Sequence, residues 1–146
     1  MNANQTPAHR FADAAAGLAG TPFRLHGRSI AGGLDCVGLV ACALQQCGRM
    51  VRAPGPYGLR NRRVDGLLHL AADNGFTAVA EGPLRRGDLM LFTTGPAQHH
   101  LAIAHDAASM IHAHAGLRRV VIQPTQPDWP LLRQWRLVDA APATTP

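Results

Sequence analysis

Residues 35–48 read Asp-Cys-Val-Gly-Leu-Val-Ala-Cys-Ala-Leu-Gln-Gln-Cys-Gly, and this stretch decides the fold. Asp35 is a good N-cap residue and Gly48 a good C′ residue, so the sequence marks both ends of a helix of roughly 12 residues. At about 100° per residue, apolar side chains fall on one side of this helix and Gln45 falls opposite them. We therefore expect a mostly buried helix with Cys36 at its amino-terminal tip.

Cys36 is the candidate nucleophile because of this placement. Free backbone N–H groups and the positive end of the helix dipole meet at a helix N-terminus, and both favour a thiolate. Cys42 and Cys47 lie further along the helix, where small buried side chains are the expected role. Three cysteines within 12 residues argue against a disulfide framework, and their spacing matches no zinc ribbon or finger. Taken alone, Cys36 also fits a buried structural cysteine.

A thiolate nucleophile needs a base, and the base needs an orienting group. Five of the eight histidines fall within residues 99–114, where two apolar runs carrying His100 and His112 predict a β-hairpin. Positions 100 and 112 face each other directly only across an odd-numbered loop or a bulge. A two-residue turn at residues 107–108 would put them on opposite faces. We expect the odd loop.

Helical and strand-like patterns in the rest of the chain predict an α+β domain, with helices first and strands later. Two further helices are expected, at His9–Ala19 and Val64–Ala72. The expected strands, about five in one antiparallel sheet, are Asp88–Thr93, His100–His105, Met110–Ala113, Leu117–Gln123 and Gln134–Val138, and Phe76–Ala80 is a candidate for a further short strand. Residues 9–139 are expected to form a single domain, with residues 1–8 and 140–146 flexible.

Composition excludes several classes of protein. The 146 residues are 47% apolar and carry a net charge of +5, with 14 arginines, no lysine, eight aspartates and one glutamate. The arginines are scattered without interleaved aromatic residues, which argues against direct nucleic-acid binding. No apolar stretch approaches the roughly 20 residues that span a bilayer, and the first residues lack a signal-peptide pattern. We expect a soluble protein made in the cytoplasm, without membrane insertion, whose charge suits an anionic cell wall or an acidic neighbour in an assembly.

Five motifs in order resemble those of the NlpC/P60 cysteine peptidases. They are Gly20-Thr21-Pro22-Phe23, Leu34-Asp35-Cys36-Val37-Gly38-Leu39-Val40, Arg86-Gly87-Asp88-Leu89-Met90-Leu91-Phe92, His100-Leu101-Ala102-Ile103-Ala104 and Ile111-His112-Ala113. The resemblance is closest to the subgroup encoded in phages and gene transfer agents, which lacks a signal peptide and occurs with tail genes. That subgroup has a proline- and tyrosine-containing loop, similar to residues 54–57, and a late tryptophan, similar to Trp129 or Trp135. The resemblance covers roughly residues 10–138.

This resemblance implies a papain-like fold, in which the helix bearing the cysteine packs on the sheet bearing the histidine. It makes Cys36 the nucleophile, His100 the general base and acid, and His112 the residue that orients His100. Asp35 caps the helix and supports the cysteine loop, and the Cys36 backbone N–H is an oxyanion donor. The implied reaction cleaves a peptidoglycan stem-peptide amide, commonly D-γ-glutamyl–diaminopimelate, through a thioester and without a cofactor.

The subgroup also implies where the protein works. Its partners would be peptidoglycan stem peptides and the tail-tip or baseplate hub proteins of a virion-like particle. Incorporated in such a tail, it would act in the periplasm or cell wall of the target cell and help the particle deliver DNA.

Phe23 departs from the family pattern, because many members have tyrosine at this position. Phenylalanine cannot donate a hydrogen bond, and losing one oxyanion donor costs on the order of 10² to 10³ in rate. Either another group substitutes for the missing hydroxyl or the enzyme is slow. His26 and Ser29 are nearby in sequence. Together with Phe23, they are the candidate substrate-binding residues. The departure leaves open a catalytically weak or inactive tail-tip or baseplate subunit with the same fold.

Two further alternatives keep other chemistries in view. One is an acyltransferase built on the same thiol–histidine chemistry. The other is a metal site formed by the clustered histidines, which lack the HxxxH helix spacing and have only Asp106 as a nearby carboxylate. We expect no metal.

Overall fold

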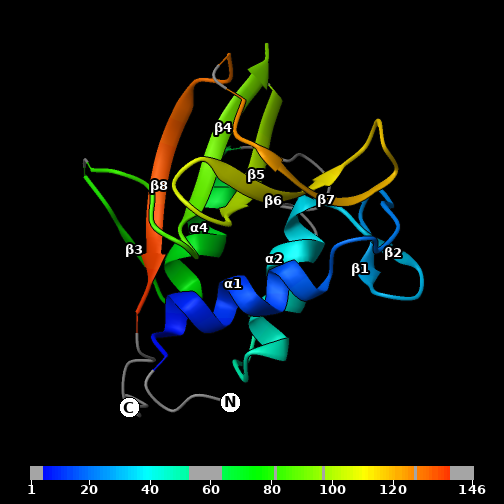
Figure 1. The fold of residues 1–146 in the computed structure, drawn as a ribbon, viewed down its shortest axis with the longest axis horizontal. Coiled ribbons are helices and arrows are strands. Elements are labelled where there is room, and N and C mark those ends of the chain that lie inside the picture. The colour runs from blue at the N-terminus through cyan, green and yellow to red at the C-terminus, as the bar shows by residue number, and fades with distance from the viewer. Residues whose placement is uncertain (1–4, 53–63, 81, 97, 127, 139–146) are drawn as a thin grey trace.

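The computed structural model describes residues 5–52, 64–80, 82–96, 98–126 and 128–138 (Figure 1). Its described helices are α1 (Pro7–Gly17), α2 (Cys36–Gln46) and α4 (Val64–Asp73). The strands are β1 (Arg28–Ser29), β2 (Gly33–Leu34), β3 (Phe76–Ala78), β4 (Leu89–Gly95), β5 (Gln98–Ala104), β6 (Ser109–His114), β7 (Arg119–Pro124) and β8 (Leu131–Leu137). One six-stranded antiparallel sheet has the order β3-β8-β4-β5-β6-β7, which confirms the α+β class.

The helix α2 follows the sequence prediction at both ends. Asp35 is its N-cap, Cys47 its C-cap, and Gly48 after it has a φ of 94°, a left-handed conformation that favours glycine. All residues from Cys36 to Leu44 are buried, so the helix is enclosed on every side rather than on one face. It contributes to the core along most of its length.

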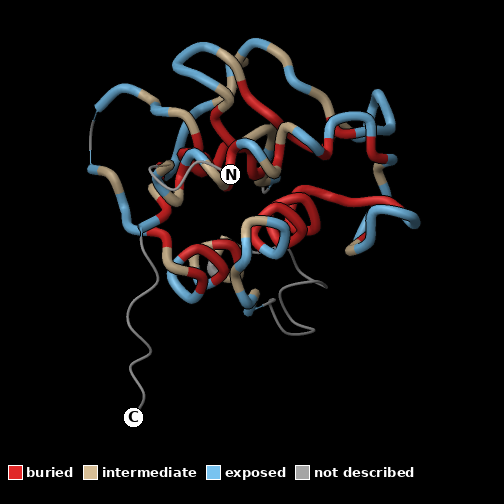
Figure 2. Tube along the Cα trace, turned by 60° about the horizontal axis from the view of Figure 1, so that its bottom comes forward, coloured by how far each residue is buried: buried red, intermediate tan, exposed pale blue. Residues whose placement is uncertain are grey.

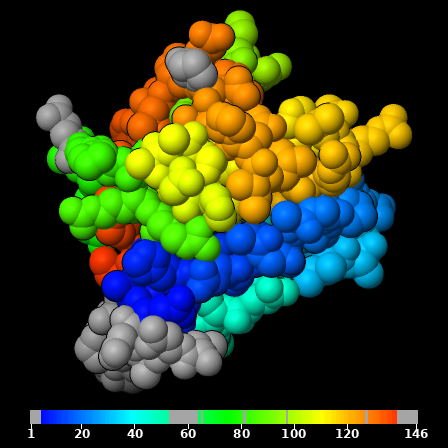
Figure 3. Space-filling view, in the orientation of Figure 1, coloured from blue at the N-terminus to red at the C-terminus, as the bar shows by residue number. Residues whose placement is uncertain are grey.

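The helix α1 starts earlier than expected. Thr6 is the N-cap, its hydroxyl accepts a hydrogen bond from the backbone N–H of His9, and Pro7 occupies the first turn. Phe11 and Ala15 face the core from this helix. In the space-filling view α1, in blue, lies at the surface between the sheet above and α2 below (Figure 3).

Strand β4 is apolar at successive positions because both faces of the sheet are covered there. Leu89 and Leu91 belong to the main core between the sheet and the helices α1, α2 and α4. Met90 and Phe92, alternating with them, belong to a second buried cluster on the opposite face, which Leu84 and Trp129 cover. Figure 2 shows buried residues concentrated in the helices and central strands, with exposed residues in the peripheral loops.

A buried carboxylate joins the start of β4 to β8. Asp88 is fully buried and accepts two hydrogen bonds from Arg136, at 2.7 and 2.8 Å. Gln134 donates to it at 2.8 Å, and the backbone N–H of Arg85 at 3.0 Å. Charge pairing and these hydrogen bonds compensate the burial of Asp88.

Several expectations are adjusted by the fold. The sheet has six strands where about five were expected, and the predicted loop before α2 contains the ribbon β1–β2. The proline- and tyrosine-containing loop at residues 54–57 and the tail at residues 140–146 lie outside the described residues. Within the described part of the chain, no helix is long and apolar enough to cross a membrane.

Candidate active site

Cys36 is the first residue of α2, and a network centred on Asp35 fixes that end of the helix. One Asp35 oxygen accepts from the backbone N–H of Gly38 at 2.8 Å and from the Arg28 guanidinium at 2.7 Å. The other accepts from the backbone N–H of His26 at 2.9 Å. The expected role of Asp35 as helix cap is confirmed, and these donors also tie it to the segment before β1.

Glycine at position 38 lets the helix start lie directly against that segment. A Cβ at Gly38 would lie 2.1 Å from the carbonyl oxygen of Gly27, and a Cβ at Gly27 would lie 2.2 Å from the carbonyl oxygen of Gly33. No side chain fits at either contact. The first turn of α2, and Cys36 with it, is therefore held against the backbone at residue 27.

The strands β5 and β6 carry the two histidines on the same face of the hairpin. Ile103 pairs with Ile111 and Ala104 with Met110, so five residues separate the last pair. The expected odd loop is confirmed. The expected direct pairing is wrong by two residues: continued along the strands, the register of Ile103 with Ile111 leaves His100 diagonal to His112. The diagonal distance is within reach of two imidazole rings.

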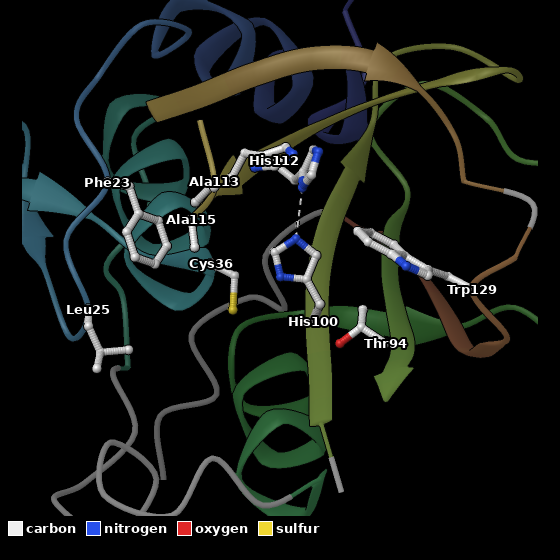
Figure 4. Close-up of a pocket in the computed structure, with 11 residues that line it drawn as sticks. Phe23, Leu25, Cys36, Thr94, His100, His112, Ala113, Ala115 and Trp129 are labelled. Carbon is white, nitrogen blue, oxygen red and sulfur yellow. Dashed lines mark hydrogen bonds between the residues drawn. The ribbon is translucent and has the colours of Figure 1, made fainter. Parts of the chain in front are cut away.

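The two imidazoles are hydrogen-bonded to each other. His100 Nε2 lies 2.8 Å from His112 Nδ1, and the rings meet edge to face with their centroids 5.0 Å apart. In the close-up the remaining ring nitrogen of His100 is on the side that faces Cys36 (Figure 4). Cys36, His100 and His112 thus form a series, with His100 in the middle.

Burial keeps His112 uncharged. Only 1% of His112 is exposed, and burial, reinforced by the charge of His114, lowers its pKa from 6.5 to about 4. The nearby Gln123 side chain opposes this shift only in part. The second nitrogen, Nε2, is buried without a well-formed hydrogen bond to any described residue. At neutral pH His112 is a neutral imidazole with one acceptor nitrogen and one N–H.

A pocket of about 370 Å³ contains this series. Phe23 and Leu25 line it near Cys36, while Thr94 and Trp129 line it beyond His100 (Figure 4). The other lining residues are His112, Ala113, His114, Ala115 and Gly116. The walls are mainly apolar.

The remaining candidate residues lie apart from this pocket. His26 and Ser29 line a separate hollow at the ribbon β1–β2, where the Ser29 hydroxyl accepts from the backbone N–H of Gly32. Only Phe23 among the three candidate substrate-binding residues lines the pocket. Thr94 and Trp129 do line it. The sequence indicated Trp129 only as one of two late tryptophans and gave neither residue a role at the site, because only the folded sheet brings them beside the histidines.

The other two cysteines lie outside the pocket. Burial raises the pKa of both Cys42 and Cys47, and their thiols approach the backbone carbonyls of Arg28 and Leu44. Among the described residues, no three histidine, cysteine or acidic side chains are grouped as a metal would require.

Several solved structures have a fold similar to this one. NlpC2 from Trichomonas vaginalis gives a TM-score of 0.68 at 17% identity, over 93% of this chain and 48% of that one. The P60 domain of antigen MAP1204 from M. avium subspecies paratuberculosis gives 0.63 at 16% identity, over 92% and 96%. The peptidoglycan hydrolase RipB from Mycobacterium tuberculosis gives 0.63 at 20% identity, over 91% and 65%.

These matches differ in how much of each protein they include. The chain spans about half the length of NlpC2, but nearly all of the P60 domain. No curated protein sequence matches the chain. The NlpC/P60 family model matches residues 20–135, a range that includes Cys36, His100 and His112. Because this match extends over most of the sequence and agrees with the fold of the solved neighbours, the chain belongs to the NlpC/P60 family.

Proposed function

We propose that this chain is a cysteine peptidase that hydrolyses amide bonds in peptidoglycan stem peptides. One observation carries the proposal: Cys36, His100 and His112 follow one another along a single pocket, with His100 2.8 Å from His112. A thiol, a base and a group that orients the base are the parts that cysteine-based acyl transfer requires. Here they come from α2, β5 and β6.

The proposed reaction proceeds through a thioester. The Cys36 thiolate attacks the amide carbonyl carbon, and the His100 imidazolium donates its Nδ1 proton to the leaving amine as the C–N bond breaks. Water then attacks the thioester and gives a proton back to His100. The carboxylic product leaves, and the Cys36 thiolate and the His100 imidazolium are restored.

His112 has a defined protonation state in this scheme. An imidazolium at His100 carries protons on both nitrogens, so its Nε2–H must donate to Nδ1 of His112. His112 can accept only as a neutral ring with its own proton on Nε2. A pKa of about 4 keeps it in that form at neutral pH.

Oxyanion stabilisation is the weakest part of the proposed site. The backbone N–H of Cys36, at the first position of α2, is the donor we assign to the developing negative charge. Phe23 lines the pocket but has no hydroxyl, and it provides an apolar wall only. We therefore expect slow turnover compared with a site that has two donors.

We take the D-γ-glutamyl–diaminopimelate bond as the bond cleaved, as the sequence resemblance implies. The fold is shared with RipB, which is a peptidoglycan hydrolase, and the +5 net charge favours approach to an anionic wall. From the same resemblance we propose that the protein is made in the cytoplasm and is incorporated in a phage-like tail or gene transfer agent. There it would contact tail-tip or baseplate hub proteins and open the wall of the target cell for DNA delivery.

Purified protein and diaminopimelate-containing muropeptides test the reaction. Mass spectrometry should detect a product with a new amino terminus on diaminopimelate. Cys36→Ala should abolish it, whereas Cys42→Ala, the same change at another buried cysteine of α2, should leave it. Cleavage that continues in Cys36→Ala would refute the mechanism.

Phe23 favours a second candidate function, a weak or inactive tail-tip or baseplate subunit with the same fold. This candidate predicts no muropeptide cleavage by the purified protein. It also predicts that tail particles incorporate Cys36→Ala as well as the unmodified chain. Measurable cleavage that depends on Cys36 excludes it.

A further inference from the structure

Trp129 contacts both histidines of the site at once. Its ring lies edge to face against His100, with centroids 5.6 Å apart and an interplanar angle of 76°. It meets His112 in the same way, at 6.0 Å and 85°. Figure 4 shows the indole beside the hydrogen-bonded pair, on the side away from Cys36.

The sheet holds Trp129 in this place. The half-buried ring packs on Phe92 with centroids 5.7 Å apart and so lies against the second buried cluster. Its backbone N–H donates to the carbonyl of Gln126, and the next residue, Pro130, accepts from the backbone N–H of Thr93 on β4. The indole is therefore anchored by β4 and the β7–β8 connection, and β4 itself pairs with β5, where Phe92 lies opposite His100.

The position of the indole bears on the bond between His100 and His112. His100 is partly exposed and lines the pocket of about 370 Å³, so water can reach the bond from the His100 side, whereas His112 is only 1% exposed. Excluding water strengthens a hydrogen bond between the two rings, because the local dielectric falls. Edge-to-face contacts also fix ring orientation, since aromatic pairs prefer this geometry.

We infer that Trp129 is a positioning residue that shields the His100–His112 hydrogen bond and holds His100 with Nδ1 toward Cys36. This inference rests on the proposed function for its catalytic consequence. The shielding itself is a property of the folded protein and can be measured without any substrate.

Exchange of the imidazole N–H that joins His100 and His112 is the direct measurement. It is followed by ¹H–¹⁵N NMR on the full chain, with the two histidines assigned by His→Asn variants. In the unmodified protein we expect one low-field N–H signal protected from exchange with water. Trp129→Ala should accelerate its exchange by roughly tenfold or more, since two edge-to-face contacts are lost together.

Matched variants separate shielding from general stability. Trp129→Phe keeps an aromatic ring and should restore most of the protection. Trp135→Phe removes the other tryptophan, which is buried in the main core away from the pocket, and should leave the exchange unchanged. If Trp129→Ala does not fold, Trp129→Leu, which keeps an apolar contact with Phe92, takes its place.

The outcomes distinguish this inference from the proposed function. Equal exchange in Trp129→Ala and the unmodified protein, or an unprotected signal in the unmodified protein, would overturn the shielding. Absence of muropeptide cleavage, together with normal protection, would count against the peptidase and leave the shielding intact. If both hold, Trp129→Ala should lower kcat by about tenfold, with KM less affected, and Trp129→Phe should recover it.

Discussion

Replacing His112 with asparagine should change how stability depends on pH. The folded protein lowers the pKa of His112 from 6.5 to about 4, mainly by burial. Between these values the unfolded chain binds a proton that the folded chain does not, so stability falls as the pH falls. Asparagine does not titrate, and its carbonyl oxygen can still accept from His100 Nε2–H.

The size of the effect follows from the shift. A change of one pKa unit corresponds to about 1.36 kcal/mol, so the full shift amounts to roughly 3 kcal/mol below pH 4. At pH 5 the loss from His112 should be about 2 kcal/mol, and at pH 7 it should be close to zero. The contribution is therefore present above pH 6.5 and is lost progressively down to pH 4.

Urea unfolding under reducing conditions at pH 7 and pH 5 measures this difference. The free energy of unfolding of the unmodified protein, minus that of His112→Asn, should fall by about 2 kcal/mol between the two pH values. A third variant, His69→Asn, changes an exposed histidine on α4 and should follow the unmodified protein. A difference that stays constant within about 0.5 kcal/mol would refute the burial argument.

Three other changes test separate parts of the structure. Asp88→Ala should destabilise the fold by about 3 kcal/mol in urea unfolding. This is at the lower end of the cost of breaking a buried ion pair, because the Arg136 side chain is 28% exposed and can be solvated. A loss below about 1 kcal/mol would contradict this. Gly38→Ala should lower the free energy of unfolding by at least about 2 kcal/mol, and the melting temperature with it, because the new Cβ meets the Gly27 carbonyl. An unchanged stability would show that the backbone at residue 27 moves freely away from the helix. Phe23→Tyr should raise kcat on muropeptides by up to about 10², since it adds a donor to the pocket; an unchanged kcat would exclude this position from oxyanion stabilisation.

The cysteine helix could be predicted from the sequence because its determinants are local. Asp35 and Gly48 act on the residues next to them, and both cap α2 as the sequence indicates. The ribbon β1–β2 could not be predicted in the same way. Its strands have two residues each, and they form because Phe23 and Arg24 lie beside Leu34 in the folded chain.

The histidine pair was only partly predictable for a related reason. Alternation along a strand predicts which face His100 and His112 share, but the exact register depends on the turn. Here Asp106 accepts from the backbone N–H of Ala108, and His105 N–H donates to the carbonyl of Ser109, which sets a five-residue separation. The resulting diagonal pairing depends on this turn chemistry and not on the apolar pattern.

Charge distribution explains how an aspartate can adjoin a cysteine that must become a thiolate in the proposed mechanism. An unpaired carboxylate at residue 35 would oppose a negative charge at residue 36. Asp35 instead accepts from Arg28 and from two backbone N–H groups, so its charge is already matched where it caps the helix. The third member of the series is a neutral imidazole at His112, which adds no second carboxylate to compete with the thiolate for the His100 proton. The thiolate and imidazolium charges of the proposed reaction therefore stay on Cys36 and His100, on either side of the place where the substrate carbonyl must lie.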